Sequence, residues 1–117
     1  MTDKIVVLVT CGSAVEAGRI ARRLVHRRLA ACANVVRSAV RSTYRWKGKV
    51  ETATEHLLVI KSARKLLPAL RGEIERLHSY DVPEVIALPI VAGSPAYLKW
   101  LAECLRPASA KKLKKRS

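Results

Sequence analysis

Two runs rich in apolar and β-branched residues, 33–46 and 49–61, are separated only by Lys47 and Gly48. Two such runs joined by a two-residue connection predict a β-hairpin. At ~3.3 Å per residue, twelve paired residues extend about 40 Å, whereas a domain of about this size has a radius of gyration of roughly 13 Å. Part of the hairpin is therefore expected to project beyond the core of its own domain.

Aromatic residues mark the end of the hairpin that is expected to project. The chain has no Phe, three Tyr and two Trp, and Tyr44 and Trp46 lie next to the turn. A projecting strand exposes unpaired backbone groups, and an exposed aromatic pair marks a contact surface. We therefore predict an obligate homo-oligomer assembled through strand pairing between subunits.

The remaining apolar runs predict alternating strands and helices. Residues 4–10 suit a buried strand, and a helical pattern follows from Ser13, which forms an S-x-x-E capping box with Glu16. Residues 67–77 have helical spacing, with Pro68 in the first turn. The expected inward residues are Ala17, Ala21, Leu24 and Val25 in the first helix and Leu67, Leu70, Ile74 and Leu77 in the second.

The C-terminal third completes the predicted fold. Residues 85–91 form a fourth apolar run, which Pro89 places at a sheet edge or a bulge, and a last helix is expected from Ser94, with Pro95 at its first position. This order predicts an α/β (α+β) ferredoxin-like βαββαβ sandwich with a long central hairpin and an extra C-terminal helix. Residues 1–106 are expected to form this single domain.

The chain is strongly basic, with 23 Lys and Arg against nine Asp and Glu, a formal net charge of +14. Residues 107–117 hold five of the positive charges and predict a disordered tail, which either contacts nucleic acid nonspecifically or is simply solvated. A second basic stripe on the first helix is either a solvent face or a surface for an acidic partner. It consists of Arg19, Arg22, Arg23, His26, Arg27 and Arg28.

Several classes of protein do not fit the sequence. The apolar runs are too short to span a membrane, and the N-terminal residues lack the pattern of a signal peptide, so we expect a cytoplasmic protein. Three widely spaced cysteines support neither a disulfide framework nor a closed zinc site. Nucleotide-binding and hydrolase motifs are absent, and the strand at residues 50–62 lacks the stacking aromatics of an RNA-recognition sheet.

Two residue types could bind a metal. His78 follows the second predicted helix and Cys11 follows the first predicted strand, and imidazole and thiolate together suit copper or zinc. A histidine at a helix C-terminus is, however, more often a cap, and a lone cysteine is more often a buried thiol. Both interpretations stay open, the structural one being favoured for each residue.

Six blocks of the sequence occur in an order and spacing that resemble the CutA family of divalent-cation-tolerance proteins: LVTC, RLAACANVV, STYRWKGKVE, LLVIKS, LHSYDVPEVIALPI and GSPAYLKWL. The resemblance covers residues 4–103 and implies a ferredoxin-like homotrimer similar in architecture to PII-type regulators. It also implies a link to divalent metals, copper among them, with His78 at the family's metal-binding histidine and no obligatory cofactor. The chain departs from the family pattern at three positions. Ser79 stands where the family usually has Pro, and Asp81 stands where it often has Glu. Val9 stands where some members have a Cys that has been proposed as a metal ligand.

The resemblance further implies a polar pocket between subunits, lined by Trp46, Lys61, Tyr80, Glu84 and Tyr97. Two functions follow from it. The first is a trimer that responds to divalent metal ions, including by copper binding, and the second is a PII-like signalling or interaction trimer that binds a small anion at the subunit interface. No pair of residues with the geometry of a general acid and base can be named, so no enzymatic activity is expected.

Overall fold

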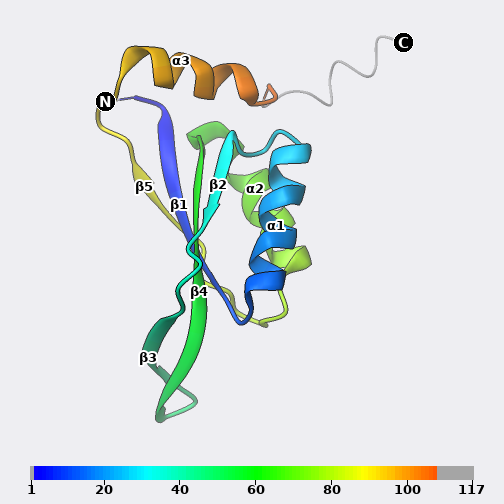
Figure 1. Cartoon of the computed structure of the whole chain (residues 1–117), viewed down its shortest axis with the longest axis vertical. Helices are drawn as coiled ribbons and strands as arrows, with labels where there is room; N and C mark the ends of the chain where they lie inside the picture. Colours follow the sequence, from blue (N-terminus) through cyan, green and yellow to red (C-terminus); the bar gives the residue numbers. More distant parts are fainter. Residues whose placement is uncertain (1, 108–117) are drawn as a thin grey trace.

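The computed structural model describes residues 2–107 and has the predicted order of elements (Figure 1). The final ten residues, which make up nearly all of the predicted basic tail, lie outside the described residues. The elements are β1 (Lys4–Cys11), α1 (Ala14–His26), β2 (Cys32–Val35), β3 (Val40–Trp46), β4 (Lys49–Ala63), the short 3-10 helix η1 (Arg64–Leu66), α2 (Leu67–Leu77), β5 (Ile86–Pro89) and α3 (Pro95–Cys104).

The strands form one antiparallel sheet in the order β2-β4-β1-β5, and β3 extends the pairing along β4. Strand β5 lies at an edge, as Pro89 predicts. Helices α1 and α2 lie together beside the sheet, whereas α3 crosses the end of the sheet that is farther from the β3–β4 turn (Figure 1). Among the described residues, no helix combines the length and the apolar character that a membrane span needs.

The prediction of one continuous strand over residues 33–46 was wrong, because a wide bulge divides it into β2 and β3. Val35 pairs with Leu58 and Val40 pairs with Glu55, so residues 36–39 lie opposite only two residues of β4. A bulge of this kind bends the strand and increases its twist. Two extra residues preserve the alternation of side chains between the two faces, since that alternation has a period of two.

The β3–β4 ribbon projects from the rest of the molecule, as its length predicts (Figure 1). The chain measures 51 × 35 × 25 Å, and its radius of gyration is 15.4 Å. Lys47 and Gly48 both have positive φ, at 50° and 81°, which is the backbone of a two-residue hairpin turn. The aromatic residues Tyr44 and Trp46 remain 41% and 42% exposed on this ribbon.

One face of the sheet forms the core against α1 and α2. Alternate residues of β1 and β4 are fully buried there, together with the inner residues of the two helices. Val25 was wrongly predicted to lie among them; it is 41% exposed, and Ile20 occupies the buried stripe, one helical turn from both Ala17 and Leu24. In α2, Leu70 and Ile74 are fully buried and Leu67 and Leu77 pack against the core, as predicted.

The other face of the sheet, here called the open face, is also largely apolar; neither α1 nor α2 covers it, and α3 lies only at its end, across a cavity from Lys4 and Ala63 (Figure 1). The open face is formed by the alternate residues of β1, β4 and β5 that point away from the core, among them Val6, Leu8, Leu57 and Val59, all only partly buried. Ile86 and Leu88 pair with Leu8 and Val6 and are 50% and 47% exposed. A sheet with two apolar faces and one helical layer is incomplete in the single chain.

Candidate functional site

His78 ends α2 and joins it to β1 through the histidine ring. Its side chain is fully buried, and Nε2 lies 2.8 Å from the carbonyl oxygen of Thr10 at the end of β1. The backbone N–H of Tyr80 donates to Nδ1 at 3.1 Å. Because Nδ1 is an acceptor, the proton lies on Nε2, where it is donated to Thr10. Both ring nitrogens are therefore engaged within the chain.

Glu16 fixes the residue after His78. The first half of the predicted capping box is present, since the Ser13 hydroxyl accepts a hydrogen bond from the Glu16 N–H at 3.1 Å. The Glu16 carboxylate, instead of returning to Ser13, accepts from the Ser79 backbone N–H at 2.6 Å and from the Ser79 hydroxyl at 3.1 Å. A proline at position 79 would have no N–H to donate. This chain therefore holds the loop after α2 by a polar tether to α1.

Tyr80 connects the same loop to β4. Its hydroxyl donates to the Glu55 carboxylate at 2.8 Å, and Glu55 is only 6% exposed. Burial, followed by the hydrogen bond to Glu55, raises the pKa of the Tyr80 hydroxyl well above its usual range. A Cβ at Gly12 would lie 3.3 Å from the Tyr80 oxygen, so the absence of a side chain there leaves room for this contact. Tyr80 is thus a fixed hydrogen-bond donor that stays protonated.

The five residues predicted to line an inter-subunit pocket are spread over the single chain. Trp46 ends β3 beside the ribbon turn, Tyr80 and Glu84 belong to the loop before β5, and Tyr97 lies on α3 at the opposite end of the molecule (Figure 1). The Tyr97 ring packs against the ring of Trp100 within α3, with the centroids 5.5 Å apart and the ring planes tilted by 37°. Any site that contains all five must therefore use residues from more than one subunit.

Lys61, the fifth of these residues, lies on the open face. It pairs with Val6 of β1 and Cys32 of β2 across the sheet, and Val59 is its apolar neighbour along β4. Its ammonium group contacts the side-chain oxygen of Asn34. Among the described residues this amide oxygen is its only hydrogen-bond partner, so the charge of Lys61 is solvated but not neutralised.

The donor set of one subunit does not fit a resident metal ion. Within residues 2–107, no three His, Cys, Asp or Glu side chains gather in a way that could hold one. Both nitrogens of His78 are already hydrogen-bonded. Cys11 is fully buried, and burial together with the charges of Glu16 and Glu55 raises its pKa to about 11. A thiol binds metal as the thiolate, which this environment disfavours.

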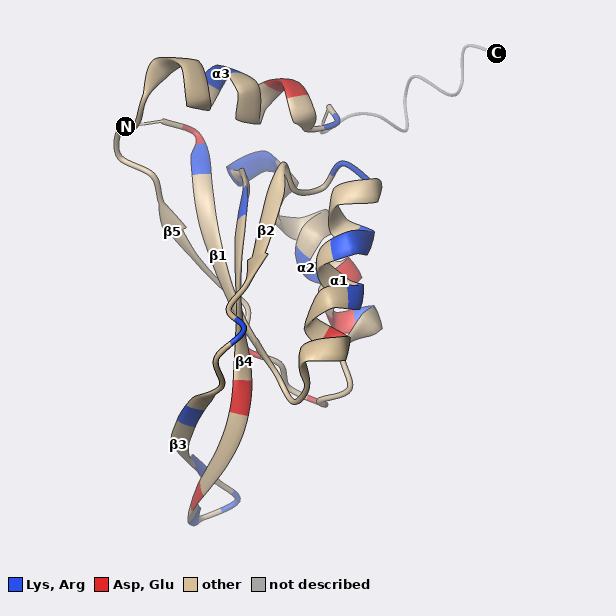
Figure 2. Cartoon of the chain, in the orientation of Figure 1, with Lys and Arg blue, Asp and Glu red and all other residues tan. Residues whose placement is uncertain are grey.

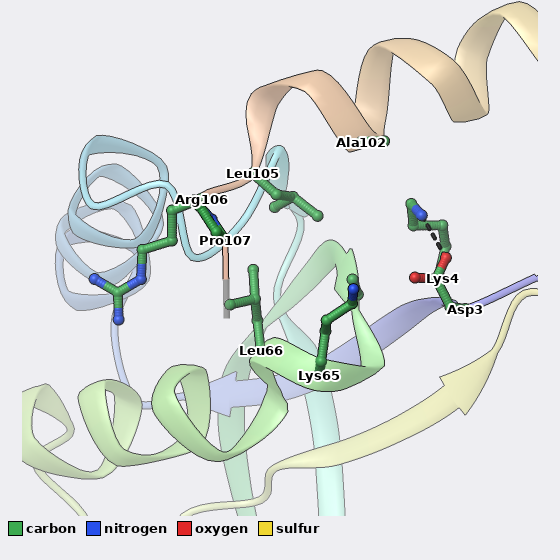
Figure 3. Close-up of a pocket in the computed structure, with 9 residues that line it drawn as sticks. Asp3, Lys4, Lys65, Leu66, Ala102, Leu105, Arg106 and Pro107 are labelled. Carbon is green, nitrogen blue, oxygen red and sulfur yellow. Dashed lines mark hydrogen bonds and ion pairs between the residues drawn. The ribbon is translucent and has the colours of Figure 1, made fainter. Parts of the chain in front are cut away.

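A cavity of about 290 Å³ lies between η1, the start of β1 and the C-terminal end of α3. Figure 3 shows Lys65 and Leu66 of η1 facing Leu105 across it. Lys4 lines the cavity as well but is paired with Asp3, and Pro107, the first residue of the predicted tail, forms part of the wall. None of the predicted site residues lines this cavity, so it is distinct from the expected pocket.

Three residues of the site, Glu16, Glu55 and Ser79, were not predicted from the sequence. Glu16 belongs to the S-x-x-E capping pattern, but that pattern predicts that its carboxylate binds the N-terminal end of the helix and not a residue 63 positions away. Glu55 lies in a long alternating strand, where nothing local distinguishes it from Glu51. His56 has a buried Nδ1 with no hydrogen-bond partner among the described residues, and no sequence pattern indicates this either.

Cys11 should be chemically inert in the folded protein. With a pKa of about 11, roughly one thiol in a thousand is ionised at pH 8, and the side chain is inaccessible. Alkylation by iodoacetamide, followed by peptide mass spectrometry, is expected to modify Cys11 at least about tenfold more slowly than the partly exposed Cys104. The difference should vanish in guanidinium; equal native rates would contradict the prediction.

Comparisons with known proteins show which family this geometry belongs to. The family model described as "CutA1 divalent ion tolerance protein" matches residues 5–104. The chain is 46% identical over 98 residues to the divalent-cation tolerance protein CutA of Thermus thermophilus, which covers 84% of this chain and 94% of that protein. It is 45% identical over 102 residues to the chloroplastic CutA of Arabidopsis thaliana, covering 87% of this chain but only 56% of the relative.

Solved structures agree with these sequence matches. The cation tolerance protein of Thermus thermophilus superimposes with a TM-score of 0.85 at 44% identity, covering 88% of this chain and 99% of the other. The CutA1 structure of Oryza sativa gives a TM-score of 0.85 at 46% identity, over 88% of this chain and 94% of the other. The chain therefore belongs to the CutA1 divalent ion tolerance protein family.

Proposed function

We propose that this chain acts in divalent-cation tolerance as a homotrimer, and that its ligand chemistry is located where subunits meet. The family membership supports the cation-tolerance role. The observation that carries the proposal is the open face, a largely apolar sheet surface that α1 and α2 leave uncovered. The proposal assigns no enzymatic activity and places the protein in the cytoplasm.

Three features of the fold support assembly through the sheet. Strands β2 and β5 are both edges, so each offers backbone groups for pairing with a neighbouring subunit. Ile86 and Leu88 expose about half of their surface, and burying the exposed half of each side chain is worth roughly 1 kcal/mol, about half of the value for a fully exposed side chain. The projecting β3–β4 ribbon also carries Tyr44 and Trp46 toward any neighbour. In a cyclic trimer each contact joins two different patches of the chain, and the ring closes after three copies.

The assembly is tested by placing a charge on the open face. Ile86→Asp and Leu88→Asp are each expected to shift the protein from trimer to smaller species at micromolar concentration, because an unpaired carboxylate in an apolar interface costs several kcal/mol. Light scattering coupled to gel filtration measures the mass. Val15→Asp is the matched control, since Val15 is 76% exposed on α1, and it should remain trimeric. A wild-type monomer at micromolar concentration would contradict the proposal.

The metal-dependent part of the proposal is a response to divalent cations, copper among them, by the assembled protein. Both nitrogens of His78 are hydrogen-bonded, and the donors within the described part of one subunit do not gather around a common point. Ligands from more than one subunit, or from exposed side chains, are therefore favoured over His78 and Cys11. His78 is better suited to connecting α2, β1 and the following loop.

Copper titration separates these roles of His78. His78→Ala is expected to bind Cu(II) with the affinity of the wild type, while losing about 1–3 kcal/mol of stability because two buried hydrogen bonds are removed. Calorimetric titration measures the first quantity and chemical denaturation the second. His26→Ala, which changes an exposed histidine on α1, is the control. A loss of Cu(II) affinity in an intact His78→Ala trimer, with none in His26→Ala, would identify His78 as a ligand.

A PII-like function, with a small anion bound between subunits, is the second candidate, and Lys61 favours it. Its charge lies on a largely apolar face next to a neutral amide, and covering that face would require a negative partner. Carboxylate and phosphate metabolites are therefore expected to raise the melting temperature of the wild type, and Lys61→Met should abolish the shift. Lys99→Met, which removes an exposed charge on α3, should retain it. No shift with any anion tested would reject this candidate.

A further inference from the structure

The outer surface of the α1–α2 layer carries arginine and no lysine. The two helices together contain no Lys, and all of their arginines are exposed. Figure 2 shows basic positions recurring along α1. We call this surface the arginine face, made up of Arg19, Arg22, Arg23, Arg27, Arg71 and Arg76.

The centre of the arginine face is a cluster in which three guanidinium groups share one carboxylate. Glu73 of α2 lies 3.2 Å from Nε of Arg23, 3.9 Å from Nη1 of Arg27 and 2.7 Å from Nη2 of Arg76. The Glu73 side chain is 10% exposed, whereas the three arginine side chains are 43–57% exposed. The largely covered Glu73 carboxylate therefore anchors the cations, and the cluster keeps two unbalanced positive charges that face solvent.

The surroundings of this cluster add charge of the same sign. Glu75, the other acidic residue on α2, pairs with Arg71 at 3.7 Å. Arg19 and Arg22 have no acidic partner among the described residues. Six guanidinium groups against two carboxylates thus leave four positive charges on the arginine face of each subunit.

The positions of the arginines along α1 form a row. Arg19 and Arg23 of α1 and Arg27, its C-cap residue, are four residues apart, so they lie on one side of the helix at steps of about 6 Å. A guanidinium group and a phosphate pair through two parallel hydrogen bonds. A row of guanidinium groups therefore suits a ligand with a series of anionic groups, each of which accepts two hydrogen bonds. Such repetition is a property of a phosphodiester chain.

We propose that the arginine face binds the phosphodiester backbone of nucleic acid without reading its sequence. Neither helix carries Trp, Tyr or Phe, which a membrane-interface surface typically uses as anchors and which single-strand binding uses for stacking. The contacts are therefore with backbone phosphates, and a duplex is a suitable partner. The arginine face lies on the opposite side of the sheet from the open face, so it stays accessible in the proposed trimer.

Fluorescence anisotropy with a labelled duplex of mixed sequence, over a series of salt concentrations, tests this proposal on the full chain. The triple variant Arg19→Gln/Arg23→Gln/Arg27→Gln should bind the duplex at least about tenfold more weakly at low salt. A plot of the logarithm of the binding constant against the logarithm of the salt concentration should become shallower by about 0.9 for each phosphate that the variant no longer neutralises. The matched control, Arg37→Gln/Arg41→Gln/Arg45→Gln, removes the same charge from the β2–β3 segment and the ribbon. It should change affinity by less than about threefold.

A variant with the opposite effect makes the test independent of folding losses. Glu73→Gln removes the carboxylate shared by three guanidinium groups, so it should strengthen binding to the duplex and steepen the salt dependence. Glu51→Gln on β4 removes the same charge at a distance from the arginine face and is its control. A gain of affinity in Glu73→Gln alone would support the proposal, and equal gains in both variants would contradict it.

The basic tail is tested separately, because it lies outside the described residues. A full-length variant in which Lys111, Lys112, Lys114 and Lys115 are replaced by Gln should retain the difference between the arginine-face variant and its control. The proposal is overturned if this tail variant alone abolishes binding, or if the two triple variants lose affinity equally. It is also overturned if the protein binds vesicles containing phosphatidylserine but not the duplex.

Discussion

The architecture follows from a sheet that is largely apolar on both faces while α1 and α2 cover one face. Strands β1 and β4 pair along eight residues and place Val7 and Ile60 against α1 and α2, which completes a core on one side. The same alternation places Leu8 and Val59 on the other side, where no described helix meets them. Because water disfavours a continuous apolar surface, this face is where the proposed assembly would place its subunit contacts. The projecting β3–β4 ribbon and the two free sheet edges are also available for contacts with neighbouring subunits in the proposed assembly.

The loop after α2 has a different role, which is to connect the helical layer to the sheet through polar groups. Glu16 binds Ser79, His78 binds Thr10 and Tyr80 binds Glu55, so three elements distant in sequence meet at one partly buried network. Buried polar groups are costly unless they are all paired, and here each of these three contacts satisfies groups that the fold takes out of water. A network with its donors and acceptors already used is suited to holding a shape. The proposal therefore assigns ligand chemistry to the open face, where the hydrogen-bond partner of Lys61 among the described residues is the neutral amide of Asn34.

The charges are divided between the surfaces in a way that fits this arrangement. Arginine is concentrated on the outer side of α1 and α2, where Glu73 organises three of the side chains, while the open face is largely apolar. A subunit that assembles through one side of its sheet leaves its helical layer free for other partners. The two surfaces can therefore carry separate functions, cation tolerance through the proposed assembly and anion contact through the arginine face.

Patterns in the sequence predict the order of the elements, the projecting hairpin and the family, and Pro89 limits the position of β5 to a sheet edge or a bulge. These are properties of local periodicity, turn residues and contiguous motifs, which a linear pattern records directly. It did not determine the bulge at residues 36–39, which depends on the register of β2 and β3 against β4, nor the exchange of Val25 for Ile20 in the core. The tertiary structure alone decided that Glu16 binds Ser79 and that Tyr80 binds Glu55, because each pair joins residues far apart in the chain whose meeting depends on packing. Hydrogen bonds that depend on long-range packing have no characteristic spacing in the sequence, so no local pattern predicts them.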